Sequence, residues 1–263
     1  MITTMITAFT AVGALVFTSL ALKATQAQNA VTEQGHFTDR YTKAVEQLDK
    51  AGTDHLQARL GAIYSLERLA RDSPRDQATI VEVLSAFIRT NAAAPTIASR
   101  DRSSCPDLPP HPDVHAALAV LSRRDSGRDN RALVDLRGTC LRNARITHLP
   151  SGGFGTNVYK AQFAGAYLDG ADLSGAELWF VDLRGAHLDG AYLNGTKLGS
   201  ADLFAAALTD THLNGANLRD ADLRSATLNG ADVRGADFSR VQHDEFTDVE
   251  GVTTDTKTLG RWW

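Results

Sequence analysis

Few side chains in this sequence are spaced to do chemistry together. His111 and His115 are four residues apart, as two metal ligands on one helical turn are, and Cys105 precedes them. A solvated helix start explains the same pair, so we predict no metal site. The other histidines are scattered, and no nucleophile stands beside a base. The sequence therefore predicts no catalytic residue, no metal and no cofactor.

A glycine-rich segment, THLPSGGFGTN, superficially resembles a phosphate-binding loop. The Gly-Lys-Ser/Thr ending of such a loop does not follow it, which argues against nucleotide binding. We interpret residues 147–157 as a surface loop that interrupts a repeat.

The bulk properties of the 263 residues are those of an ordinary globular chain with a formal charge of −4. No basic patch favours nucleic acid, so we expect no direct nucleic-acid partner. The two cysteines, Cys105 and Cys140, lack a CxxC pair or ligand-like spacing, and we expect neither a structural disulfide nor a zinc site.

The N-terminus carries an apolar run, residues 5–22, without a charge. Its 18 residues would span about 27 Å as a helix, close to the ~30 Å of a bilayer core. No basic residue precedes the run, whereas Lys23 and Arg40 follow it, which predicts a single transmembrane helix with a cytoplasmic body. The alternative is a secretory signal, for which Thr25 and Ala27 offer a small-residue cleavage site.

A period of five residues dominates the C-terminal half. In a straight helix each fifth residue is rotated by about 140° from the last, and in a strand an odd period alternates faces. The chain must therefore turn every five residues, and glycines two places after many of the leucines supply the freedom to do so. The apolar positions are Phe163, Leu168, Leu173, Leu178, Leu183, Leu188, Leu193, Leu198, Leu203, Leu208, Leu213, Leu218, Leu223, Leu228, Val233 and Phe238.

This pattern resembles the pentapeptide-repeat family, whose A(D/N)LXX unit is present in AYLDGADLSGAELWFVDLRGAHLDG and in ANLRDADLRSATLNGADVRGADF. The resemblance implies a right-handed quadrilateral β-helix with four pentapeptides in each coil. We assign residues 130–241 to this solenoid. Residues 242–263 leave the period and are predicted to cap it, with Trp262 and Trp263 over the end.

Residues 23–124 contain amphipathic helices, with a Pro- and Ala-rich linker at 92–112 and a last helix to Arg124. Two segments also look like the helical region that precedes the repeats in membrane-anchored bacterial members of the family. They are RYTKAVEQL and RLGAIYSLERLARDSPRDQATIVEVLSAFI. These helices could form a binding groove, but a solenoid needs its open end covered, and we predict that role. The predicted fold class is α+β.

The outward positions can be sorted into columns, because residues twenty apart stack when four repeats make one coil. Asp182, Asp202 and Asp222 form an acidic column, which resembles the surface of the family members that mimic DNA and protect DNA gyrase from quinolones. Arg184 and Arg224 flank the same column, which argues against mimicry.

Aromatic residues provide a second candidate surface. Trp179 and Phe180 follow Leu178, and Phe204 lies outward one coil further on. Clustered exposed aromatics are typical of contact surfaces, although the loop or helices of the same chain could cover them.

The sequence thus predicts a non-enzymatic, membrane-anchored scaffold that binds a protein partner. A DNA-mimicking inhibitor of gyrase and an exported solenoid are the alternatives. The sequence names neither the partner nor an oligomeric state.

Overall fold

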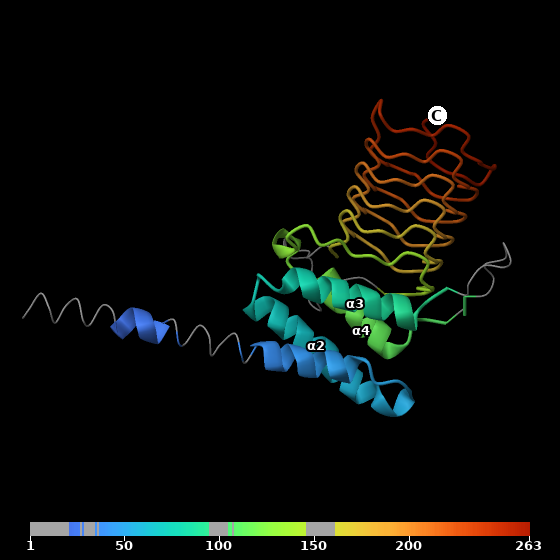
Figure 1. The fold of residues 1–263 in the computed structure, drawn as a ribbon. Coiled ribbons are helices and arrows are strands. Elements are labelled where there is room, and N and C mark those ends of the chain that lie inside the picture. Colours follow the sequence, from blue (N-terminus) through green and yellow to red (C-terminus); the bar gives the residue numbers. More distant parts are fainter. Residues whose placement is uncertain are drawn as a thin grey trace, which may run out of the picture.

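The protein consists of a helical region and a stack of four-sided coils that rises from it (Figure 1). The C-terminus lies at the far end of the stack. The computed structural model describes residues 21–26, 28, 35, 37–94, 105–106, 108–145 and 161–263.

Each side of a coil pairs with the next coil through one residue in parallel register. Asp182 pairs with Asp202, and Asp202 pairs with Asp222, so the register is twenty residues. The amide of Leu183 donates to the carbonyl of Asp202 at 2.8 Å, and the amide of Asp202 donates to Val181 at 2.9 Å. Four pentapeptides therefore complete one coil.

The core of the stack consists of columns of leucine and small residues that point inward. The leucines of the regular repeats from 203 to 223 are completely buried, namely Leu203, Leu208, Leu213, Leu218 and Leu223. Thr196 and Thr211 take positions that alanine has in other repeats, and both are buried. Their hydroxyls donate to the carbonyls of Leu173 and Leu188 at 3.0 and 3.2 Å, which satisfies the buried oxygens.

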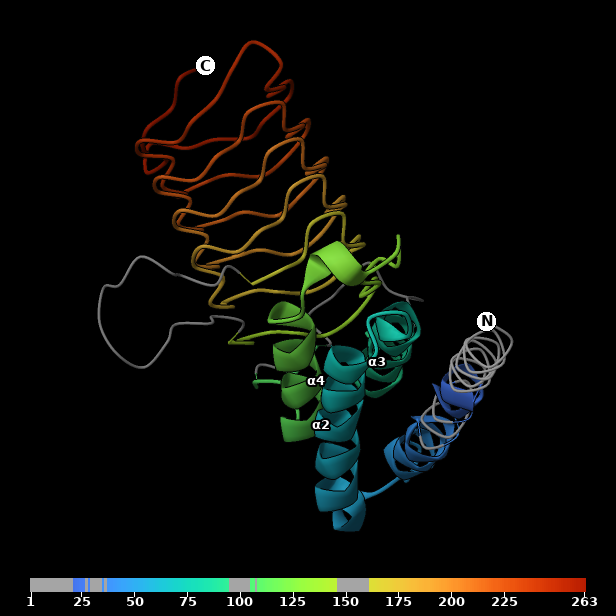
Figure 2. The same cartoon turned by 90° about the vertical axis from the view of Figure 1, so that its left-hand side faces the viewer.

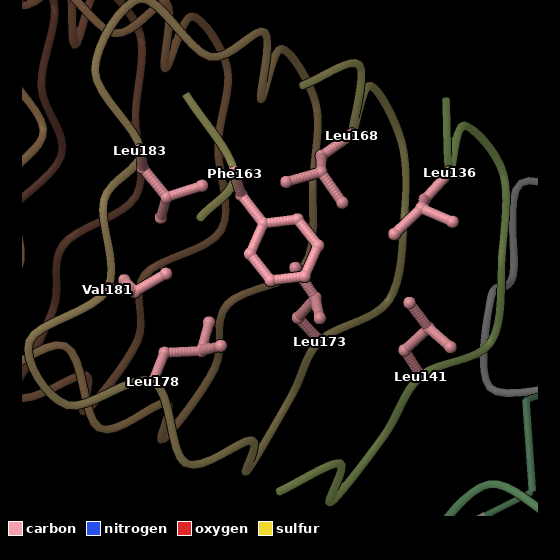
Figure 3. A pocket seen from close by; sticks show the side chains of 8 residues that line it. All are labelled: Leu136, Leu141, Phe163, Leu168, Leu173, Leu178, Val181 and Leu183. Atoms are coloured by element: carbon pink, nitrogen blue, oxygen red, sulfur yellow. The ribbon is translucent and has the colours of Figure 1, made fainter. Parts of the chain in front are cut away.

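The lower coils enclose a small apolar cavity of about 10 Å³. Eight apolar side chains, among them Phe163 and Leu173, point toward it in Figure 3. A space that holds at most one water and offers it no polar partner is a packing defect and not a ligand site.

The first coil is offset from the regular period. Asp135 pairs with Tyr167, 32 residues on, whereas Gln162 pairs with Asp182, 20 residues on. The difference is an insertion between the first two coils. The predicted loop at 147–157 falls in this insertion and lies outside the described residues.

The helical region packs the helical residues 37–48 with three further α-helices. A buried ion pair joins two of them, because Nε of Arg59 donates to Oδ2 of Asp113 at 2.6 Å. Arg59 also donates to the carbonyls of Lys50 and Gly52 at 2.7 Å, so its buried charge is well partnered. The elements are η1 (Thr53–His55), α2 (Leu56–Asp72), α3 (Gln77–Asn91), α4 (Pro112–Ser122) and η3 (Ser126–Arg128).

The helices cover the open end of the solenoid, as both views of the fold show (Figures 1 and 2). The chain after α3 pairs with the first coil through an antiparallel bridge between Ala93 and Thr139. The amide of Gln162 donates to the carbonyl of Ser122 at 2.8 Å, which connects the end of α4 to the second coil. Backbone groups at this edge are thereby protected from pairing with another chain.

The far end is closed by side chains of the C-terminal residues. Trp262 and Trp263 both meet the ring of Phe238 edge-on, with centroids 5.8 and 5.5 Å away, and Trp262 stacks on His243 at 4.4 Å. These contacts cover Phe238, which is the last buried residue of its column.

The predicted membrane location is corrected by the structure. No helix among the described residues is long and apolar enough to cross a bilayer. The run at 5–22 itself lies outside the described residues, apart from Ala21 and Leu22. It is near the minimum length for a span and contains Thr and Ser, so its apolar character alone did not establish an anchor.

The expectation of no disulfide is wrong. Cys105 and Cys140 are bonded to each other, with their Cα atoms 5.5 Å apart. Their separation of 35 residues gives no local spacing signal, because the pairing arises only when the linker folds back onto the first coil.

Replacing a buried leucine tests the inward orientation of the columns. We expect Leu203→Ala to lower the free energy of unfolding by about 2 to 5 kcal/mol, because it leaves a cavity in a packed stack. Chemical denaturation measures the change, with Leu108→Ala at an exposed position as the matched control. Equal stability of the two variants would contradict the assignment.

Candidate interaction surface

One side of the solenoid carries the three aspartates predicted from the sequence. We call the column of Gln162, Asp182, Asp202, Asp222 and Gln242 the aspartate face. Parallel bridges join each of these residues to the next, so the predicted stacking is a feature of the structure.

Two of the three carboxylates of the aspartate face, those of Asp182 and Asp222, are paired with arginines that stand two residues later. Arg184 donates to both oxygens of Asp182 at 2.9 and 2.7 Å, and Arg224 does the same to Asp222 at 2.9 and 2.6 Å. Nε of Arg184 also lies 3.6 Å from Asp202. The three aspartate side chains are only 4, 21 and 16 % exposed.

These ion pairs stabilise the charged form of the acids. Hydrogen bonds from Arg224 hold the pKa of Asp222 below its ordinary value. On another side of the coil the same Asp-x-Arg unit recurs, and hydrogen bonds from Arg234 lower the pKa of Asp232 to about 2. The acids of these units are therefore charged at neutral pH and are locally neutralised by arginine.

Trp179 and Phe180 form the corner that precedes the aspartate face. The ring of Trp179 lies against Gly199 in the next coil, and a Cβ atom at position 199 would overlap it. Trp179 is therefore partly used in packing. This role of Gly199 was not predicted from the sequence, although a glycine directly after a core leucine, where other repeats have a larger residue, was a visible signal.

Phe180 adopts a left-handed backbone conformation, with φ of 58°. Glycine takes the equivalent corner position in many repeats, for example Gly185 and Gly190. Among the described non-glycine residues with positive φ, Phe180 is the only aromatic. Its side chain is nevertheless 38 % exposed.

Phe204 stands at the opposite edge of the aspartate face, in the corner that follows Leu203. The amide of Gly185 donates to its carbonyl at 2.8 Å, so Phe204 stacks above Arg184. The guanidinium carbon of Arg224 lies 5.9 Å from its ring centroid. Phe204 is 41 % exposed, and no ring contact among the described residues joins it to Trp179. The predicted aromatics thus border one face from two corners and do not form one cluster.

The histidine and cysteine residues considered as metal ligands are engaged elsewhere. Nδ1 of His111 contacts the carboxylate of Asp113 at 2.7 Å, and Cys105 is in the disulfide. His115 lines an open cleft with Arg145, and burial together with the charge of Arg145 lowers its pKa. Within the described ranges no group of three or more His, Cys, Asp or Glu residues could hold a metal ion.

Comparison with known proteins identifies the repeat. Residues 161–199 and 201–240 match the family model for pentapeptide repeats in eight copies. No curated protein matches the chain significantly.

Several solved structures are similar to parts of the chain. The pentapeptide repeat protein Rfr23 from the cyanobacterium Cyanothece 51142 is 33 % identical, with a TM-score of 0.36, over 48 % of this chain and 88 % of that chain. HetL from Nostoc sp. strain PCC 7120, a pentapeptide repeat protein involved in heterocyst differentiation regulation, is 29 % identical, with a TM-score of 0.27, over 41 % and 55 %. QnrB1, a plasmid-mediated fluoroquinolone resistance protein, is 18 % identical, with a TM-score of 0.32, over 47 % and 75 %.

The matched repeats are the ones that build the four-sided coils described above. This chain therefore belongs to the pentapeptide-repeat family, whose fold is a right-handed quadrilateral β-helix.

Proposed function

We propose that the protein is a non-enzymatic interaction module that binds a partner protein along the aspartate face. In this proposal Phe180 and Phe204 contact the partner from the two edges of the face. The arginine-paired carboxylates between them form a polar centre.

The observation that carries the proposal is the conformation of Phe180. A left-handed conformation costs a residue with a Cβ atom roughly 1 to 2 kcal/mol, and a bulky residue there is unusual. Strain of this kind persists only where the surrounding structure enforces it, and it clusters at functional sites. An exposed aromatic held in a costly conformation, opposite a second exposed aromatic, fits the anchors that dominate protein interfaces.

The pairing of the aspartates argues against the alternative of DNA mimicry. A mimic must present unpaired negative charge at the spacing of a phosphate backbone, one charge per 3.4 Å of strand. In the aspartate face, Arg184 and Arg224 form ion pairs with Asp182 and Asp222, which locally neutralise the negative charge of these carboxylates. We therefore do not propose a gyrase-directed function for this chain on the basis of its similarity to QnrB1.

Two substitutions at position 180 isolate the backbone strain. Both Phe180→Gly and Phe180→Ala remove the ring, but only glycine relaxes at a φ of 58°. We expect the glycine variant to exceed the alanine variant in unfolding free energy by about 1 kcal/mol. Thermal and denaturant unfolding of the pair measures this difference, and the reverse order would refute the left-handed conformation.

Arg224→Gln tests the neutralisation of the acidic column. We expect the pKa of Asp222 to rise toward the ordinary value of about 4, because its largest stabilising hydrogen bonds are removed. In the unmodified protein the folded pKa is lowered, so the stabilisation is complete above about pH 4 and is lost as the pH falls through the folded pKa.

Carboxyl ¹³C NMR titration measures this pKa directly. Arg261→Gln is the matched control, because Arg261 donates to a hydroxyl of Thr254. An Asp222 pKa that does not move in Arg224→Gln would argue against a role of arginine in this face.

Photo-crosslinking locates the partner surface. We expect benzoylphenylalanine at positions 180 and 204 to form adducts with the same protein in the cells that make the chain. The same label at Phe246, which is 69 % exposed on the last coil, is the control and should form none. The double variant Phe180→Ala/Phe204→Ala should weaken retention of that protein at least tenfold, if each ring contributes about 1 kcal/mol. Equal labelling from position 246, or adducts confined to this same chain, would sink the proposal.

A further inference from the structure

The disulfide between Cys105 and Cys140 uses every cysteine of the chain. It joins the connection between α3 and α4 to an outward position of the first coil, where Cys140 pairs with Asp172. Cys105 is 5 % exposed, so this bond is not an accident of two surface thiols.

The backbone around the bond is already organised. The amide of Cys140 donates to the carbonyl of Ala92 at 2.6 Å, and the neighbouring Ala93 bridges Thr139. The cross-link therefore reinforces the seam at which the helical region covers the solenoid. Closing a segment of 35 residues also restricts the unfolded chain, which is how a disulfide stabilises a fold.

Such a bond depends on the compartment. Thiols within bonding distance stay reduced in the cytosol, and structural disulfides form and persist in oxidising compartments. We propose that the folded body of this protein works in an oxidising compartment outside the cytoplasm, where the Cys105–Cys140 bond is a permanent structural cross-link.

The chemistry requires an oxidant. The two thiols lose two protons and two electrons as the sulfur–sulfur bond forms, and the electrons reduce the disulfide of a thiol–disulfide oxidoreductase to a dithiol. Of the two interpretations of the apolar run at residues 5–22, the proposal favours the secretory signal over the transmembrane helix. It also contradicts the prediction that the body of the protein is cytoplasmic. A body outside the cytoplasm also does not meet DNA gyrase. The inference does not depend on the proposed partner surface.

The redox state inside cells is the first test. Cells that produce the full chain with a C-terminal tag are quenched in acid, and thiols are alkylated with polyethylene-glycol maleimide in denaturant. We expect no adduct before reduction and two after it. Cys105→Ser and Cys140→Ser should each take one adduct without reduction. Two adducts on the unmodified chain before reduction would overturn the proposal.

Location and stability complete the test. Protease added to cells with a permeabilised outer envelope should digest the tag while a cytoplasmic marker survives, and a tag shielded like the marker would contradict the proposal.

Reduction of the purified chain should raise its unfolded fraction by roughly 30- to 1,000-fold. The variant Cys105→Ser/Cys140→Ser, which controls for effects of the reductant, should not respond. An unmodified chain equally indifferent to reductant would overturn the structural role.

Discussion

The solenoid and the surface that it presents depend on the pairing of each coil with the next. A pentapeptide buries one leucine and one small residue, and a single coil exposes both of its backbone edges. Stacking at a register of twenty residues buries the side chains and satisfies the amides at once. The stack then needs both ends closed, and the helical region and the C-terminal tryptophans do so with different chemistry. The interior of the solenoid accepts only apolar or small side chains, so charged and large polar residues are confined to the corners and outward positions.

Those outward positions explain what the surface can do. Asp182 and Asp222 are each held by an arginine two places later, which makes the acidic column a structural element of the face. The aromatic corners make fewer contacts within the coil: Trp179 packs on Gly199, and the ring of Phe204 lies near the guanidinium of Arg224. Phe180 and Phe204 are nevertheless 38 and 41 % exposed, and the coil does not need this exposure.

The sequence predicted the solenoid well, because a strict period of five fixes which residues point inward. The aspartate column followed from that period together with the four repeats per coil that the family resemblance implies. Side-chain contacts between coils, such as Trp179 on Gly199, depend on rotamers that a period does not encode. The disulfide was missed because Cys105 and Cys140 meet only through tertiary folding, and the membrane prediction relied on an apolar run whose length was near the threshold.

The most direct test of the interaction surface rotates one of its edges. A second copy of the pentapeptide Ala171–Gly175, inserted between Gly190 and Ala191, keeps the period of five but turns Phe204 onto another corner. The same insertion between Asp210 and Thr211 leaves Phe180 and Phe204 in register and is the matched control. If both variants fold, the account predicts that only the first loses the protein captured from position 180. Equal capture by the two variants would contradict it.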